Sequence, residues 1–177
     1  MNELQQKLSE SLRDVKDFPR PGIIFKDITP VLKNPDLCKE VVEVFCEHAH
    51  SIGVDVVAGI ESRGFLFGML IASKLNIPFV PIRKKGKLPY LTLSERYELE
   101  YGFAEMEIHT DAITKGQRVL LHDDVLATGG TMEAASKLIQ RSEGEIAGYS
   151  FLLSLKFLNG RERLIKCCPN LFSIIDF

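Results

Sequence analysis

The stretch VLLHDDVLATGGTM, residues 119–132, decides the fold of this chain. It begins with an apolar, β-branched run typical of a buried parallel strand, and this run ends at two adjacent acids, Asp123 and Asp124. Small, hydrogen-bonding residues follow, and from Met132 onward apolar residues recur at helical spacing. The stretch therefore predicts a strand, a turn and a helix in direct succession.

The turn after the two acids has the composition of a phosphate-binding site. A helix N-terminus offers free N–H groups, and ligands of open α/β sheets bind beside the carboxyl ends of strands. Glycine lets the backbone approach an anion closely, and threonine adds hydroxyl donors. The residues expected to bind the phosphate are Ala127, Thr128, Gly129, Gly130 and Thr131. The neighbouring carboxylates suit sugar hydroxyls or magnesium. An ordinary strand-turn-helix with capping side chains is the alternative, but it leaves the glycine pair beside the acid pair unexplained.

Further apolar runs extend this pattern over the whole chain. They predict core strands that alternate with helices, at residues 54–60 and 77–82, from about residue 118 to the two acids, and at residues 146–155 and 172–176. This order indicates an α/β fold with an open, mostly parallel sheet of about five strands flanked by helices, in a single domain of residues 1–177. An amphipathic helix is expected over residues 2–16, and a β-ribbon over residues 88–109.

The overall composition excludes several classes of protein. The net charge of -2 gives no general electrostatic reason to expect a nucleic acid or an anionic membrane as partner. There is no apolar run of membrane-spanning length and no signal-like leader, so a cytoplasmic protein is expected. The four cysteines lack the paired spacing of a zinc or redox site and are interpreted as reduced thiols.

Cations follow two of the predicted strands. Ser62 and Arg63 come after the strand at residues 54–60, and Arg83, Lys84 and Lys87 come after the strand at residues 77–82. Arginine and lysine neutralise anions through charge-assisted hydrogen bonds, so a second anion site is expected here. The alternatives are a solvated basic loop and, for Arg63, a structural salt bridge.

The stretch at residues 119–132 resembles the phosphoribosyl diphosphate (PRPP) signature of the type I phosphoribosyltransferases. Segments 18–30, 59–68, 83–89 and 100–102 stand in the order of that family, and they are most similar to its adenine-using members. The resemblance implies a small N-terminal hood at about residues 1–33 and a flexible β-ribbon lid at about residues 84–110. It also implies transfer of the 5-phosphoribosyl group from PRPP to N9 of adenine, giving AMP and pyrophosphate, by a homodimer in purine salvage.

The resemblance also implies roles for individual residues. Adenine is expected at Ile24, Phe25 and Lys26, with Phe25 stacking on the base. Glu100 would exchange a proton with N7 of the purine, and Tyr101 would belong to the lid.

The remaining roles concern PRPP and its leaving group. Asp123 and Asp124 would hold the ribose and favour a positive C1′, with Mg²⁺ bound mainly through PRPP near them. Pyrophosphate is expected at the cations after the two strands. His122 lies where the family usually has an aliphatic residue, and it is interpreted as a packed strand histidine outside the site.

Three other functions stay open at this point. One is a phosphoribosyltransferase for another purine base, such as guanine, hypoxanthine or xanthine. Another is a PRPP-binding regulator without catalysis, although no DNA-binding module is visible in the sequence. The weakest is a nucleic-acid-binding role based on Lys84, Lys85 and Lys87, because the flanking chain is not basic.

Overall fold

The computed structural model of the chain describes residues 1–98 and 102–177. The chain divides into two compact units, Met1–Val44 and Phe45–Phe177, and each is described by itself. The predicted hood, residues 1–33, falls within the first unit. The interpretation of residues 1–177 as a single domain stays a prediction.

The first unit begins with helix α1 (Glu3–Ser11), which a capping box at Asn2 starts. The Asn2 side chain accepts the Gln5 N–H, and the Gln5 side chain accepts the Asn2 N–H, both at 2.9 Å. The helix ends at Ser11, so the prediction of one helix over residues 2–16 is wrong for its last part. Strand β1 (Arg13–Lys16) there pairs antiparallel with β2 (Ile24–Asp27), because cross-strand hydrogen bonds satisfy the backbone in place of a helix.

Helix α2 (Thr29–Leu32) and helix α3 (Pro35–Ile52) follow this hairpin. The side chain of Asn34 accepts the N–H of Leu37 at 3.1 Å, and Pro35 occupies the first position of α3. Asn34 therefore caps the N-terminus of α3. The boundary between the two units lies within α3.

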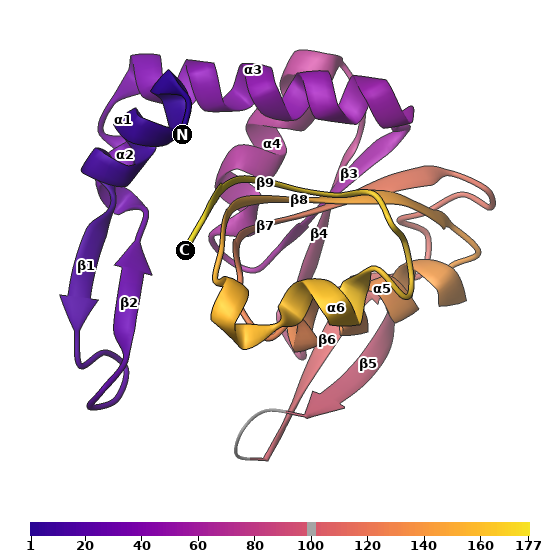
Figure 1. Cartoon of the computed structure of the whole chain (residues 1–177). Coiled ribbons are helices and arrows are strands. Elements are labelled where there is room, and N and C mark those ends of the chain that lie inside the picture. The colour runs from indigo at the N-terminus through magenta and orange to yellow at the C-terminus, as the bar shows by residue number, and fades with distance from the viewer. Residues whose placement is uncertain (99–101) are drawn as a thin grey trace. The chain divides into compact units, whose positions relative to one another are not determined.

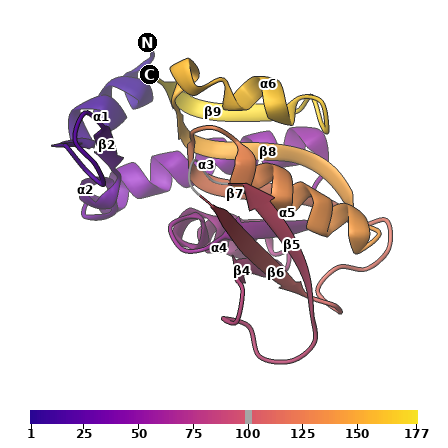
Figure 2. The same cartoon turned by 90° about the horizontal axis from the view of Figure 1, so that it is seen from below.

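The described part of the second unit contains a seven-stranded sheet in the order β5-β6-β4-β3-β7-β8-β9 (Figure 1). Five strands run parallel and correspond to the five predicted strands: β3 (Val56–Ile60), β4 (Phe79–Lys84), β7 (Arg118–Leu126), β8 (Glu145–Ser154) and β9 (Leu171–Asp176). The predicted ribbon is the antiparallel pair β5 (Thr92–Glu98) and β6 (Phe103–His109), and it continues the sheet beyond β4 (Figure 2). The mostly parallel α/β fold is therefore confirmed, with two strands added at one edge.

Helices cover both faces of this sheet. They are α4 (Gly64–Leu75), α5 (Gly130–Arg141) and α6 (Gly160–Leu164), and a 3-10 turn at Lys156–Leu158 (η1) precedes α6. Leu121 of β7 packs in one core cluster with Leu138 of α5. His122 points to the opposite face because successive strand residues alternate, and its ring lies 4.9 Å from that of Phe45 in α3. Strand β7 is thus buried on both faces, and its carboxyl end is held rigidly.

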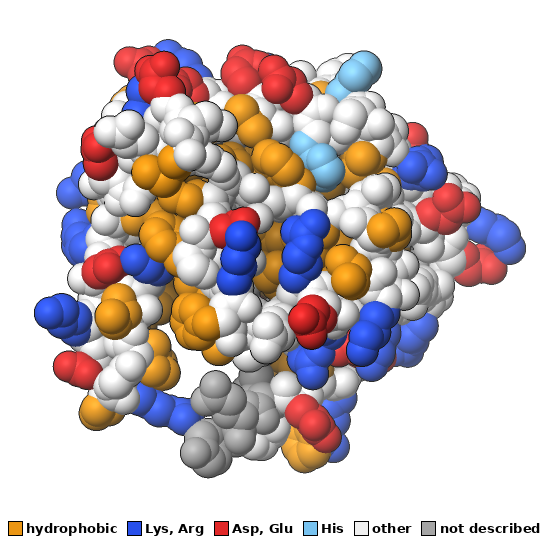
Figure 3. Space-filling view, viewed as in Figure 1, with side chains coloured by type: hydrophobic (Ala, Val, Ile, Leu, Met, Phe, Trp, Pro, Cys, Tyr) orange, Lys and Arg blue, Asp and Glu red, His pale blue; other side chains and the backbone are white. Residues whose placement is uncertain are grey.

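The surface carries charges of both signs. Figure 3 shows Lys and Arg side chains interspersed with Asp and Glu side chains over the face that it draws. Within residues 1–98 and 102–177, no helix combines the length and the apolar character needed to span a membrane.

Candidate active site

Strand β7 does not stop at the two acids, where it was predicted to end, because Val125 and Leu126 still pair with β8. Both acids lie near its carboxyl end, between β3 and β8. Asp124 is only 2% exposed, and its N–H donates to Oδ1 of Asp123 at 2.9 Å. Burial raises the pKa of Asp123 well above its usual value, and the negative charge of Asp124 raises it further. This carboxyl therefore keeps a proton more readily than a free aspartate, while it remains able to accept hydrogen bonds from hydroxyls.

The turn that follows the acids is shaped by two glycines far apart in sequence. Gly129 has a φ of +79°, a left-handed conformation that favours glycine, and a Cβ there would lie 3.0 Å from the carbonyl oxygen of Gly160. A Cβ on Gly160 would lie only 2.1 Å from the carbonyl oxygen of Ala127. The segment before α6 therefore packs directly against the turn and fixes its shape.

Helix α5 begins at Gly130, and no side chain of the described residues caps its N-terminus. The first N–H groups of a helix lack intrahelical partners, so this end of α5 suits a bound anion. Arg163 of α6 lies nearby, because its Nη1 donates to the carbonyl oxygen of Thr128 at 3.4 Å and its Nε lies 3.3 Å from the carboxylate of Glu133. The phosphate-binding role of the turn stays a prediction with this geometry in its favour.

The turn after β3 meets the acids from the neighbouring strand. Gly64 opens α4 against β7, where a Cβ would lie 2.7 Å from the carbonyl oxygen of His122. Arg63 forms an ion pair with the buried carboxylate of Asp124. A pocket of about 230 Å³ results, and it is lined by Glu61, Ser62, Arg63, Lys84, Asp123 and Asp124. The structure thus brings together three of the five residues predicted to bind pyrophosphate and both acids.

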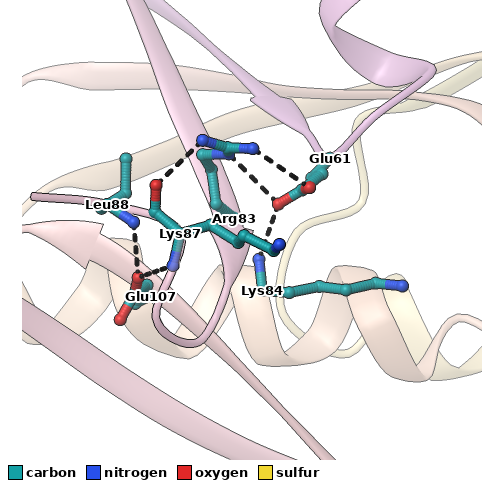
Figure 4. A network of polar contacts seen from close by, with 6 residues as sticks. All are labelled: Glu61, Arg83, Lys84, Lys87, Leu88 and Glu107. Atoms are coloured by element: carbon teal, nitrogen blue, oxygen red, sulfur yellow. Dashed lines mark hydrogen bonds and ion pairs between the residues drawn. The ribbon is translucent and has the colours of Figure 1, made fainter.

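The other two predicted cations, Arg83 and Lys87, belong to a polar network at the end of β4 (Figure 4). Arg83 donates to both carboxylate oxygens of Glu61, from Nε and Nη2, at 3.2 Å each. Its Nη1 donates to the carbonyl oxygen of Lys87 at 2.9 Å. The guanidinium is therefore engaged by the protein itself, and neither residue lines the pocket.

The residues predicted to bind adenine lie on β2, in the first unit. The ring of Phe25 contacts that of Phe18 edge to face, with centroids 5.2 Å apart, and Lys26 lies 2.7 Å from Asp14 in an ion pair. Ile24 is exposed. Adenine binding by these residues stays a prediction.

The predicted lid spans β5 and β6. Next to its tip, the Arg96 guanidinium lies 3.8 Å from the ring centroid of Phe103. The expected proton-transfer residue Glu100 and the lid residue Tyr101 lie outside the described residues, and their roles stay predictions.

His122 is fully buried, and its interpretation as a packed strand histidine is confirmed. Its Nδ1 lies 2.9 Å from the Ser150 hydroxyl, and Nε2 has no hydrogen-bond partner among the described residues. Burial lowers the pKa of His122 to about 3, so the ring is neutral at physiological pH. The four cysteines are free thiols.

Sequence reasoning missed four residues at this edge of the sheet: Glu61, Glu107, Gly160 and Arg163. Glu61 stands in the same turn as Ser62 and Arg63, so an acid beside an expected anion site was a visible signal. Glu107 occupies a position of an alternating strand and is 4% exposed. No sequence signal identifies Gly160, because its role depends on contact with residues 31 to 33 positions earlier in the chain.

Comparisons with known proteins agree with this geometry. Residues 28–176 match the family described as "Phosphoribosyl transferase domain". The adenine phosphoribosyltransferase of Cytophaga hutchinsonii is 53% identical over 98% of this chain and 96% of its own length.

Two solved structures are also similar to this chain. The adenine phosphoribosyltransferase from Thermoanaerobacter pseudethanolicus has a TM-score of 0.94 and 44% identity, over 98% of this chain and 99% of that one. The Saccharomyces cerevisiae enzyme, complexed with an imino-altritol bisphosphate and adenine, has a TM-score of 0.92 and 37% identity over the same shares.

Proposed function

This chain belongs to the adenine phosphoribosyltransferase family, and we propose on that basis that it transfers the 5-phosphoribosyl group of PRPP to N9 of adenine, giving AMP and pyrophosphate. The observation that carries the proposal is the end of β7. There a carboxylate pair leads within three residues into a glycine turn that Gly160 supports from behind. Such an edge offers acceptors for ribose hydroxyls and donors for a phosphate at once.

We assign the 5-phosphate of PRPP to residues 127–131 and the ribose hydroxyls to Asp123 and Asp124. The raised pKa of Asp123 and the ion pair of Asp124 with Arg63 lower the net negative charge of the pair. A ligand that carries several phosphates is therefore repelled less than two free carboxylates would repel it.

The leaving group is assigned to the pocket beside the acids. Ser62, Arg63 and Lys84 line it, and Lys87 stands in the adjoining loop. As the bond from C1′ to pyrophosphate breaks, negative charge grows on the leaving group and positive charge on the ribose. The cations stabilise the first charge and the carboxylates of β7 stabilise the second, in fixed positions.

Magnesium is assigned to this site together with PRPP. Within the described ranges, no three His, Cys, Asp or Glu side chains are grouped to hold a metal ion. Asp123 and Asp124 supply the hard oxygen ligands that Mg²⁺ prefers, so they would hold it together with oxygens of PRPP. When bound, Mg²⁺ adds positive charge near the departing pyrophosphate.

The base and its proton are assigned from the family resemblance. Ile24, Phe25 and Lys26 would bind adenine, with the ring of Phe25 against the purine. Glu100 would exchange the proton at N7, and Tyr101 would help the lid to exclude water during transfer.

We further propose that the protein works as a cytoplasmic homodimer. Leu66, Met69 and Leu70 lie at helical spacing on α4 and are between 42% and 51% exposed. Contact with a second copy would remove this apolar surface from water. The expected molar mass in light scattering is twice the 19.9 kDa of the chain.

The deciding experiment supplies the purified protein with PRPP, Mg²⁺ and one free base at a time. We expect AMP from adenine, and no nucleotide from guanine, hypoxanthine or xanthine at comparable rates. Nucleotide formation from another base alone would overturn the substrate assignment. Binding of PRPP without turnover of any base would leave a regulator instead of an enzyme.

A further inference from the structure

Glu61 is an acid inside a pocket that we assign to an anion. Its side chain lines the same 230 Å³ space as Arg63 and Lys84. A carboxylate at this place repels pyrophosphate, so the pocket would gain affinity if the acid served no other purpose. Its contacts show what that purpose is.

The carboxylate of Glu61 is fully committed to the end of β4. It accepts two hydrogen bonds from Arg83, at 3.2 Å each, and one from the backbone N–H of Lys84 at 3.0 Å. The side chain is only 15% exposed, and burial by itself would raise the pKa of Glu61. The hydrogen bonds and the positive charges of Arg83 and Lys87 outweigh burial and lower this pKa, so the acid stays ionised.

A second acid holds the other end of the same loop. Oε1 of Glu107 accepts the N–H groups of Lys87 and Leu88, at 3.0 and 2.9 Å, and the side chain is almost fully buried. Arg83 links the two acids, because it donates to the carbonyl oxygen of Lys87 as well as to Glu61 (Figure 4). The loop from Arg83 to Leu88 is thus fixed at three points of its backbone, at Lys84, Lys87 and Leu88.

This arrangement sets the direction in which the Lys84 side chain leaves the backbone. Figure 4 shows the side chain of Lys84 extending away from Glu61, while its N–H points at the Glu61 carboxylate. The same side chain lines the pocket with Asp123 and Asp124. Fixing the Lys84 backbone therefore limits the region that its ammonium group can reach to the neighbourhood of this pocket.

We propose that Glu61 is a positioning residue for pyrophosphate: acting through Arg83 and the Lys84 backbone, it holds the Arg83–Leu88 loop so that the Lys84 side chain faces the leaving group. The proposal rests on the function proposed above and deepens it. Arg83 then acts mainly through the loop and not as a free cation. The opposite reading, in which Glu61 only repels the ligand, predicts the opposite effect of removing its charge.

The experiment measures the affinity for inorganic pyrophosphate with Mg²⁺ by calorimetry, in the wild type and in Glu61→Gln. We expect at least tenfold weaker binding in the variant and a similar rise in the KM for PRPP, with the KM for adenine unchanged. Glu61→Asp should recover part of the affinity, since it restores the charge on a shorter side chain. Unchanged or tighter binding by Glu61→Gln overturns the proposal.

Two further variants separate positioning from other causes. Arg83→Lys keeps the positive charge but loses the forked geometry, so we expect it to weaken binding as Glu61→Gln does. Combined with Glu61→Gln, it should add little further loss. If Glu61→Gln does not fold, Arg83→Lys carries the test, and wild-type affinity in it overturns the proposal.

The matched control is Glu105→Gln. This change breaks the 2.7 Å ion pair between Glu105 and Lys85 in the same loop, without touching Arg83 or Glu61, and we expect wild-type pyrophosphate affinity. Failure of the wild type to make AMP would count against the proposed function itself. Normal AMP synthesis combined with unaltered Glu61→Gln affinity would count against the positioning role alone.

Discussion

The turn after β3 and the turn after β7 stand on neighbouring parallel strands, yet they present different groups to the same edge of the sheet. The first offers charged side chains, among them Glu61 and Arg63, and these are paired with other side chains of the protein. The second offers mainly backbone, shaped by Gly129 and Gly160.

The two turns therefore differ in how much of their positive charge is already neutralised. The ion pair with Asp124 offsets the charge of Arg63 before a phosphate binds at its other N–H groups, whereas no side chain of the described residues caps the N-terminus of α5. We therefore expect the turn after β7 to set basal affinity for a phosphate. The turn after β3 should respond to the charge on the ligand.

The largest effect is expected from changing Asp123 and Asp124, the two acids that lie beside both turns. Asp123→Asn combined with Asp124→Asn removes the negative charge that we assign to the ribose, and it removes the partner of Arg63. We expect AMP synthesis to fall by at least about 10²-fold, the typical cost of losing a fixed electrostatic group. The far-UV circular dichroism should stay that of the wild type. Unchanged turnover would show that the acids do not take part.

The next largest effect should come from the backbone turn. Gly160→Ala places a methyl group 2.1 Å from the Ala127 carbonyl oxygen, so the turn must shift. We expect a loss of about 1–3 kcal/mol in the free energy of unfolding and weaker binding of PRPP. Urea unfolding and the KM for PRPP measure both. Gly116→Ala is the control for the KM, because a methyl group there meets nothing within 4 Å and Gly116 precedes β7, at the opposite end of that strand from the turn. Its φ of +79° makes the substitution cost stability, but the KM for PRPP should stay that of the wild type.

A smaller effect is expected from the charged turn. Arg63→Gln leaves the buried carboxylate of Asp124 without its cation, and Arg63 itself is 40% exposed. We expect a loss of about 1 kcal/mol in stability, which is less than the roughly 1.5–3 kcal/mol of a hydrogen bond to a charged group, because solvent screens the pair. The KM for PRPP should rise, and its dependence on ionic strength should become shallower than that of the wild type. An unaltered salt dependence would contradict a role of this turn in sensing ligand charge.

The smallest effect on activity should come from His122, which lies on β7 but faces neither turn. His122→Val with Ser150→Ala removes both partners of one buried hydrogen bond, so activity at neutral pH should persist. The pKa of His122 is lowered to about 3, so in the wild type stability is lost as pH falls below about 6.5, the value in the unfolded chain. We expect the variant to avoid roughly 3 kcal/mol of this loss at pH 4. Acid unfolding followed by fluorescence or circular dichroism checks it.

The fold was predictable where periodicity and chain order agree. The strand, acid pair, turn and helix at residues 118–141 follow from a buried run that stops at polar residues. The helix over residues 2–16 was predicted too long, because Val15 fits a helical stripe as well as the antiparallel pairing with Phe25 that the chain forms. Pairing between strands depends on partners that a local pattern does not contain.

The candidate site was predictable for residues at or near strand ends. It was not predictable where a role depends on contacts between residues far apart in the sequence. Lys84 ends β4, Ser62 closely follows β3, and Asp123 lies near the end of β7, so parallel pairing brings them to one pocket. The engagement of Arg83 by Glu61 was not visible, since it depends on side-chain geometry between two strands. The support of the turn by Gly160 was hidden likewise, because only the folded backbone shows where a methyl group fails to fit.

Because Gly160 packs against Ala127, the turn at residues 127–131 gains its support only after residue 160 has been synthesised. A nascent chain that has emerged only as far as α5 already contains both acids and the glycine turn, but it lacks the segment that buttresses them. Arrested ribosome complexes of increasing length should therefore capture nucleotide only after residue 160 has left the exit tunnel. The chain would thus become competent to bind nucleotide only after the residues that we assign to the phosphate and the ribose have already been made.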